Sequence, residues 1–226
     1  MRRLKLLGVA CAAVFVLASL ASASASAFVL PEVLGVEATA FTTLSDAANP
    51  VFSTVGGLVV TCEDWHGEGT VEASKTLGLF HITFLGKCKG TFKEITNPCT
   101  GLGDAAETIL VLGKWHTVVD TKVGEALGAA ILLLLEPVHF TCGIILVKVT
   151  GSVMCLILEP LTAAKVHLFH CTQTGGKANE RKYLNDSGVE TTNEPLLASS
   201  SEGATEEAGE SALGTIEFKN AVTVDD

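Results

Sequence analysis

Two carboxylates beside an aromatic residue are the first candidates for chemistry in this chain of 226 residues. Glu63 and Asp64 are adjacent, and Trp65 and His66 follow them directly. A glycoside hydrolase needs two carboxyl groups about 5 to 9.5 Å apart. Glu63, Asp64 and His66 therefore form a candidate polar cluster for a catalytic or ligand-binding role. The alternative interpretation is an ordinary turn. The nucleophile-elbow pattern G-x-S-x-G does not occur, so no catalytic residue is assigned.

A second candidate site contains histidine and cysteine. His167 and His170 form an H-x-x-H pattern beside Cys171. On a helix these histidines would share a face, but the surrounding pattern favours a strand, where they point to opposite faces. His167 and Cys171 do share a strand face and would form a site only if Cys171 were a free thiol. We therefore predict neither a metal site nor a cofactor.

The N-terminus has the three parts of a secretory signal peptide. Basic residues at positions 2, 3 and 5 precede an apolar core, Leu6–Leu20, and a run of small residues, Ala21–Ala27. This order predicts a signal peptide over residues 1–27. Cleavage after Ala27 would leave Phe28 as the new N-terminus, and cleavage after Ala25 is the alternative.

Composition excludes several classes of protein. The net charge is -10, with 48% hydrophobic and 18% charged residues. This balance argues against a wholly disordered chain and against a nucleic-acid-binding protein, which needs clustered Lys and Arg. Removal of residues 1–27 leaves 12 basic against 25 acidic side chains, and no later stretch is long and apolar enough to cross a membrane as a helix. We expect a secreted, extracytoplasmic protein with no transmembrane segment after cleavage.

Cysteines provide the clearest structural prediction. Cleavage would remove Cys11 and leave an even number, which in an exported chain indicates disulfides. No C-x-x-C motif occurs, so thioredoxin-like and zinc-ribbon sites are not indicated. Sequence alone does not fix the connectivity; the pairing that we predict is Cys88–Cys99, Cys155–Cys171 and Cys62–Cys142.

The dominant hydrophobic period is two residues, which is typical of strands. Thr215–Val224 and Ile145–Val153 alternate between apolar and polar side chains, as expected for an antiparallel sheet with one face in water. Leu77–Leu85 is apolar on both faces and is predicted to be a central strand that is covered on both sides. Residues 126–135 fit a strand or a helix, and the neighbouring strands favour a strand. Residues 198–212 are rich in Ser, Gly and Glu and predict a mobile acidic loop.

These elements predict one all-β domain over residues 28–226. We expect an antiparallel two-sheet sandwich linked by disulfides, with a closed β-barrel as the alternative. The apolar interior of such a barrel could hold a small ligand.

Three stretches resemble a known group of proteins. They are Leu77–Cys88 (LGLFHITFLGKC), Phe140–Val153 (FTCGIILVKVTGSV) and Glu206–Val224 (EEAGESALGTIEFKNAVTV). Together with the signal peptide, they resemble a family of uncharacterised secreted bacterial proteins of about 200 residues. The resemblance implies an exported, β-rich, disulfide-linked domain and carries no known activity. Cys62, Cys88, Cys99 and Cys142 match the family pattern, which implies that Cys155 and Cys171 are an added pair.

Three functions remain open at this point. The first is a non-catalytic exported protein that binds an unknown protein partner or sits at the cell envelope. The second is a barrel-type carrier of a small apolar ligand. The apolar runs Leu77–Leu85 and Ala126–Leu135 suggest this function. The third is an extracellular hydrolase with Glu63, Asp64 and His66 in its site.

Overall fold

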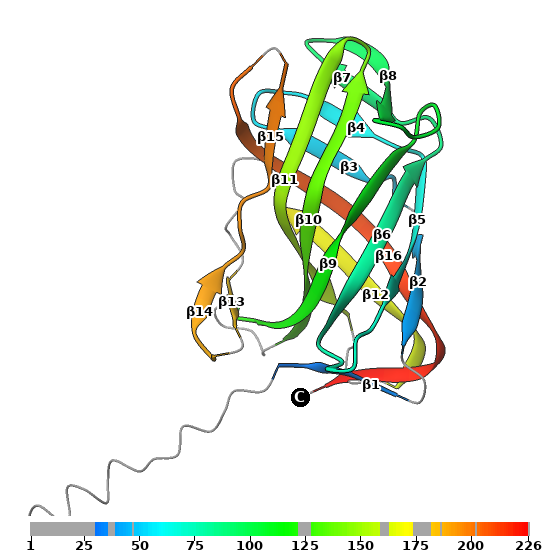
Figure 1. Cartoon of the computed structure of the whole chain (residues 1–226), viewed down its shortest axis with the longest axis vertical. Coiled ribbons are helices and arrows are strands. Elements are labelled where there is room, and N and C mark those ends of the chain that lie inside the picture. Colours follow the sequence, from blue (N-terminus) through cyan, green and yellow to red (C-terminus); the bar gives the residue numbers. More distant parts are fainter. Residues whose placement is uncertain are drawn as a thin grey trace, which may run out of the picture.

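The computed structural model describes residues 30–35, 39–46, 48–121, 128–158, 163–173, 182–185, 187–201 and 203–225. Every regular element in this part of the chain is a strand, and the strands wrap around a common interior (Figure 1). Their bounds are β1 Glu32–Gly35, β2 Ala40–Ser45, β3 Val51–Thr54, β4 Val59–Thr61, β5 Asp64–Thr70, β6 Leu77–Leu85, β7 Lys89–Phe92, β8 Ile95–Gly101, β9 Ile109–Asp120, β10 Gly128–Cys142, β11 Ile145–Ile157, β12 Ala164–Gln173, β13 Lys182–Leu184, β14 Glu190–Thr192, β15 Leu197–Ser200 and β16 Glu206–Asp225.

Eight strands close into a ring. Their order is β12, β11, β10, β9, β6, β5, β2 and β16, and β16 pairs again with β12. All these pairs are antiparallel, and we call the eight strands the main ring. The predicted all-β, antiparallel, disulfide-linked fold is confirmed. The strands form one continuous sheet that closes on itself, rather than dividing into two stacked sheets.

Four shorter strands, which we call the bridge, connect β16 to β10. Starting at β16, the bridge runs through β3, β4, β7 and β8 to β10. It fits because both long strands change partners. β16 pairs with β2 over Gly214–Phe218 and with β3 over Ala208–Ser211. β10 pairs with β9 as far as Leu135 and with β8 from Phe140. Pro137, which has no N–H to donate, lies where the register of β10 shifts.

Aromatic side chains fill the main ring. Phe41 lies between Trp115 and Phe218, with ring centroids 5.8 Å apart in both pairs. Trp65 packs against Phe169 at 5.6 Å. Both tryptophans are 2% exposed. These large side chains, contributed by β2, β5, β9, β12 and β16, tie together strands that are far apart in sequence.

The disulfides join Cys62 to Cys88, Cys99 to Cys142 and Cys155 to Cys171. The predicted Cys155–Cys171 bond is confirmed, and the other two predicted pairings are wrong. Cys88 and Cys99 are indeed neighbours, since the Cys99 N–H donates to the Cys88 carbonyl at 2.8 Å. The register of β8 on β10, however, places Cys99 directly opposite Cys142. Such bonds are typical of proteins that fold in an oxidising environment outside the cytoplasm.

Two sequence predictions need correction and one is confirmed. The segment at 198–212 is not a mobile loop, because β15 ends and β16 begins within it. Its small residues fill crowded interior positions: Ala198 is 2% exposed and Ala208 is fully buried.

Leu77–Leu85 is β6, with a ring strand on each side, but Leu79 is 51% exposed rather than covered. The sequence left residues 126–135 as either a strand or a helix, with a strand preferred. Residues 128–135, the described part of this stretch, form a strand, which confirms that preference.

The predicted signal peptide and its cleavage site at Ala27 and Phe28 lie outside the described residues. Among the residues that are described, no helix is long and apolar enough to span a membrane.

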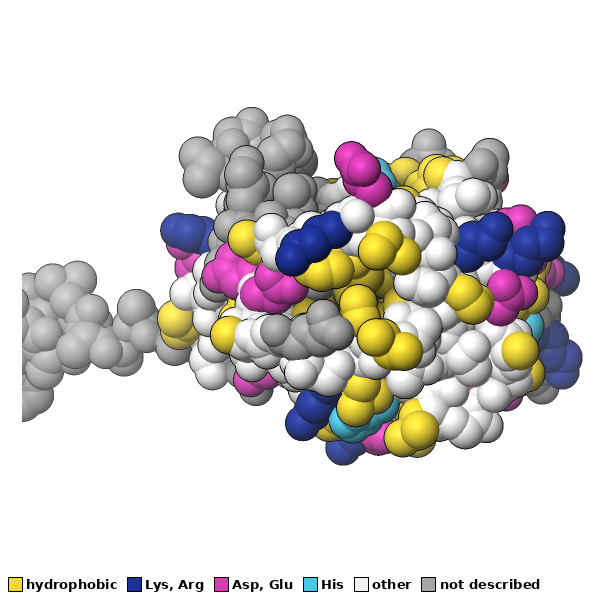
Figure 2. Space-filling model, turned by 90° about the horizontal axis from the view of Figure 1, so that it is seen from above, with side chains coloured by type: hydrophobic (Ala, Val, Ile, Leu, Met, Phe, Trp, Pro, Cys, Tyr) yellow, Lys and Arg dark blue, Asp and Glu magenta, His cyan; other side chains and the backbone are white. Residues whose placement is uncertain are grey.

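At the end of the molecule seen from above, hydrophobic side chains gather near the middle of the face (Figure 2). Turns at this end carry the exposed residues Ile95 and Ile144.

Candidate functional site

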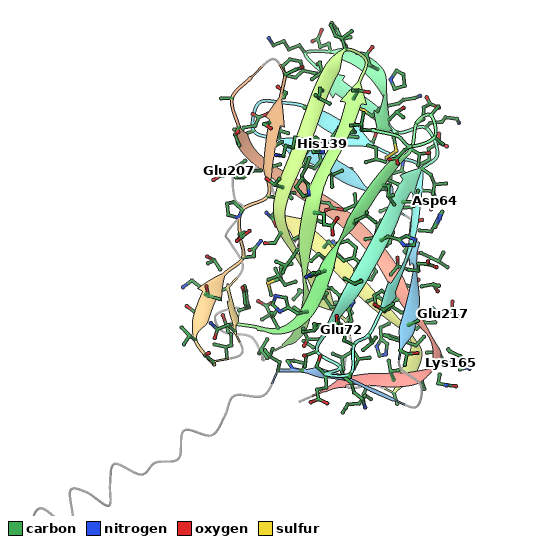
Figure 3. All side chains as sticks on the ribbon, viewed as in Figure 1. Asp64, Glu72, His139, Lys165, Glu207 and Glu217 are labelled. Atoms are coloured by element: carbon green, nitrogen blue, oxygen red, sulfur yellow. A yellow bond between two sulfur atoms is a disulfide. The ribbon has the colours of Figure 1, made fainter. Side chains whose placement is uncertain are left out.

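The predicted polar cluster does not converge on one point. Lys87 donates to the Glu63 carboxylate at 3.0 Å, and both side chains are more than half exposed. Asp64 accepts a hydrogen bond from the Ser45 hydroxyl and another from the Trp65 N–H at 2.7 Å. Asp64 and His66 share the outer face of β5, where Asp64 points away from the interior (Figure 3). The three side chains lie on the surface, apart from the interior.

The histidine–cysteine candidate is also dispersed. β12 is a strand, and His167 faces the interior, where its Nε2 lies 3.0 Å from the Val222 carbonyl oxygen. His170 faces the other side, as predicted, and Cys171 is bonded to Cys155. Across the described residues, no group of three or more His, Cys, Asp or Glu side chains could hold a metal ion.

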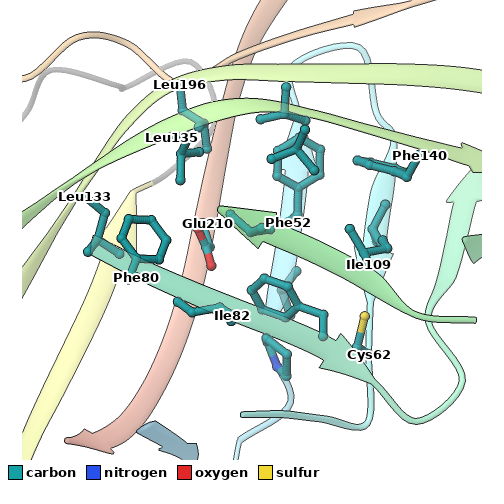
Figure 4. A pocket seen from close by; sticks show the side chains of 17 residues that line it. Phe52, Cys62, Phe80, Ile82, Ile109, Leu133, Leu135, Phe140, Leu196 and Glu210 are labelled. Atoms are coloured by element: carbon teal, nitrogen blue, oxygen red, sulfur yellow. The ribbon is translucent and has the colours of Figure 1, made fainter. Parts of the chain in front are cut away.

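An interior cavity is the strongest candidate site. It has a volume of about 80 Å³ and lies between the bridge and the main ring (Figure 4). It is located where β10 leaves β9 and where β16 changes from β2 to β3, because the departing strands leave space between them. The side chains around it are almost all apolar: Pro50, Val51, Phe52, Val60, Cys62, Phe80, Ile82, Phe84, Ile109, Val111, Leu133, Leu135, Val138, Phe140, Val149 and Leu196.

Glu210 is the exception in this lining. Its side chain points into the cavity from β16 (Figure 4). Alternation along the strand puts it on the same face as Ala208 and Ala212, which are fully buried and 6% exposed. Glu210 itself is half-buried, because the cavity leaves part of its surface open.

Burial governs the chemistry of this carboxyl group. The apolar surroundings raise the pKa of Glu210 to about 7, because they disfavour its charged form. Among the described residues, no side chain makes a hydrogen bond or ion pair with it. The cavity thus places a carboxyl group that gains or loses its proton near neutral pH next to apolar side chains.

Buried polar groups hold the segment that closes one side of the cavity. The Ser152 hydroxyl donates to the Glu194 carbonyl at 2.8 Å. The Asn193 amide donates to the Ser152 carbonyl at 3.2 Å. Gly151 has a φ of +114°, and a Cβ there would collide with the Pro195 carbonyl. The close approach brings Leu196, which is fully buried, against the cavity.

Comparison with known proteins finds no matching family model, no similar curated protein and no similar solved structure. Sequence reasoning missed Glu210, because its neighbourhood was interpreted as a loop. Extending the alternation of Ile216 and Phe218 back along the same strand would have placed Glu210 on the inward face.

Proposed function

We propose that this is an exported binding protein that holds a small apolar molecule in its interior cavity. The apolar lining, with a single ionisable side chain, carries this proposal, because ligand sites combine an apolar wall with few polar groups. The predicted signal peptide over residues 1–27 and the three disulfides support export. The polar cluster at Glu63 gives a hydrolase no comparable enclosed site.

Cavity volume limits the ligand. A water molecule occupies about 30 Å³ in the liquid, and an apolar cavity of about 150 Å³ can bind benzene. A cavity of about 80 Å³ therefore accepts a molecule of three or four heavy atoms, or one terminus of a longer molecule. A complete fatty acid does not fit into it.

Xenon is a suitable first probe, because it is apolar and small. We expect xenon to shift the amide NMR signals of Ile82, Val111 and Leu133, which line the cavity. Val111→Phe fills the space and should abolish these shifts. Val166→Phe adds the same atoms at a position that is 48% exposed and should leave them intact. Absence of any xenon-induced shift in the wild type would refute the proposal.

Export has its own test. Intact mass of the exported protein, with and without reduction in a thiol-alkylating reagent, should give a chain that starts at Phe28 and has no free thiol. A chain that retains residues 1–27 would contradict the predicted cleavage. An alkylated thiol without reduction would contradict complete disulfide formation.

A protein partner is the second candidate, supported by apolar residues on adjacent turns. Ile144 is 90% exposed and Ile95 is 65% exposed. The turn that carries Ile144 lies beside β8, the strand that begins at Ile95, since the Gly143 N–H donates to the Pro98 carbonyl at 3.1 Å. A double substitution Ile95→Ser/Ile144→Ser should release the protein from the envelope fraction if a partner binds here. Unchanged fractionation would remove this candidate.

A further inference from the structure

Glu210 gives the cavity a chemical preference that an apolar pocket alone would not have. Its carboxyl group is the single titratable side chain among the residues that line the cavity. Cys62 also lines it, but its sulfur is bonded to Cys88. The side chains that face Glu210 from β3, β4, β6, β9, β10 and β11 are all uncharged. On β12, the residue directly opposite Glu210 is Gln173, which is polar but uncharged. A charged partner for Glu210 must therefore come from a molecule in the cavity.

We propose that the cavity binds a short primary alkylammonium ion, with its ammonium group on the Glu210 carboxylate and its alkyl group against the apolar wall. This inference rests on the proposed function. An ammonium group is a compact cation with three donors. A carboxylate left unpaired in apolar surroundings is strongly unfavourable, so a ligand that supplies both the charge and the hydrogen bonds has an advantage over a neutral one.

Cavity size favours an ammonium over larger cations. At about 80 Å³, the space accepts a nitrogen with two or three carbons. A planar guanidinium group would occupy this volume before any alkyl group was added. Short amines satisfy both the carboxylate and the apolar wall within the available volume.

Divalent cations fit the site poorly. Calcium takes six to eight oxygen ligands, and magnesium requires near-octahedral coordination. Glu210 offers one carboxyl group, and the side chains around it are Val, Leu, Ile, Phe, Pro and Cys. Such a wall cannot complete a metal coordination sphere, whereas an ammonium group needs no such set of ligands.

Protonation of Glu210 should control this binding. Because burial raises its pKa to about 7, most molecules carry a charged Glu210 at pH 8 and a neutral one at pH 6. A short alkylammonium ion has a pKa close to that of lysine, about 10.4, so it stays charged at both values. Its affinity should therefore fall about tenfold from pH 8 to pH 6.

The test compares propylamine with propan-1-ol, which has similar size and no charge. Calorimetric titration of the wild type at pH 8 should show propylammonium binding at least tenfold more tightly than the alcohol. Glu210→Gln should lose this preference and still take up xenon. Glu207→Gln, which removes an exposed carboxylate from the outer face of the same strand, should behave as the wild type.

The outcomes separate the two proposals. Xenon uptake without an amine preference would overturn the role of Glu210 and leave the proposed function intact. Absence of both would overturn both. Equal propylammonium affinity in Glu210→Gln and the wild type, or an affinity independent of pH between 6 and 8, would also reject the assigned contact.

Discussion

The main ring and the bridge differ in how side chains fill the space that their strands enclose. Both enclose interior space with strands, but the main ring fills it with Phe41, Trp65, Trp115, Phe169 and Phe218. Among these aromatic side chains lies a cavity of about 30 Å³. Beside the bridge, a cavity of about 80 Å³ remains. Large aromatic side chains close the main ring, whereas the space beside the bridge stays open.

Disulfide bonds stabilise the bridge, whereas aromatic packing stabilises the main ring. Its strands are three to seven residues long, whereas those of the main ring extend to 20 residues. The Cys62–Cys88 and Cys99–Cys142 bonds tie the bridge together. A Cβ at Gly90 would lie 2.6 Å from the Cys142 sulfur and 2.7 Å from the Cys99 sulfur, so β7 passes close to the second bond. Disulfides stabilise this region without filling it, and a binding cavity can persist.

Trp115→Ala should have the largest effect. Removal of this buried side chain should cost about 3–5 kcal/mol of unfolding free energy. The change also leaves the Thr70 carbonyl without the indole N–H that donates to it at 3.0 Å. Urea denaturation measures the loss, and Trp115→Phe should lose less because it keeps an aromatic ring against Phe41. A loss below about 1 kcal/mol would show that aromatic packing does not support the main ring.

Removal of single disulfides compares the two regions directly. Cys99→Ala/Cys142→Ala opens a loop of 43 residues, and Cys155→Ala/Cys171→Ala opens one of 16 residues. The chain-entropy model predicts losses of about 4 and about 3 kcal/mol respectively. Urea denaturation without reductant should give this order. A greater loss from the main-ring pair would indicate that packing around the bond, rather than loop length, sets its contribution.

Glu210→Gln should increase stability at alkaline pH. The pKa of Glu210 rises from 4.5 in the unfolded chain to about 7 in the folded protein, so the folded state holds the proton more tightly. Unfolding free energy should therefore decrease as pH rises through this interval, by about 3 kcal/mol in total. The variant should be more stable than the wild type at pH 8 and similar near pH 4.5. Urea midpoints that follow the same pH dependence in both proteins would contradict a buried, ionisable Glu210.

The sequence predicted more of the strands and disulfides of the main ring than of the bridge. Thr215–Val224 and Ile145–Val153 alternate clearly, and both lie in long ring strands. The Cys155–Cys171 bond was predictable because it joins two neighbouring strands of one ring. Pairing in the bridge depends on which strand lies beside β10, and alternation carries no information about that. Cys99 therefore faces Cys142 rather than Cys88.

The candidate site was hidden for a related reason. Glu210 lies in a segment whose Ser, Gly and Glu content is typical of loops, yet small residues are also what a crowded strand needs. Ala208 and Ala212 face inward in β16, where they are fully buried and 6% exposed. Composition alone does not distinguish these two situations. Glu63 and Asp64 attracted attention as adjacent acids, but Glu63 pairs with Lys87 and Asp64 accepts from Ser45, so the two carboxylates have separate surface partners.

Glu63→Gln should have the smallest effect. Its ion pair with Lys87 is exposed on both sides, and such pairs contribute about 0–1 kcal/mol. Urea denaturation at low and high salt measures this contribution, which should shrink as salt screens the charges. Lys87→Gln provides the matched control, because it breaks the same pair from the other side and should give the same small loss. A loss above about 2 kcal/mol in Glu63→Gln alone would imply that Glu63 has a partner beyond Lys87. The polar cluster at Glu63 would then again be a candidate site, even though its ion pair lies on the surface and the Glu210 carboxyl group points into an interior cavity.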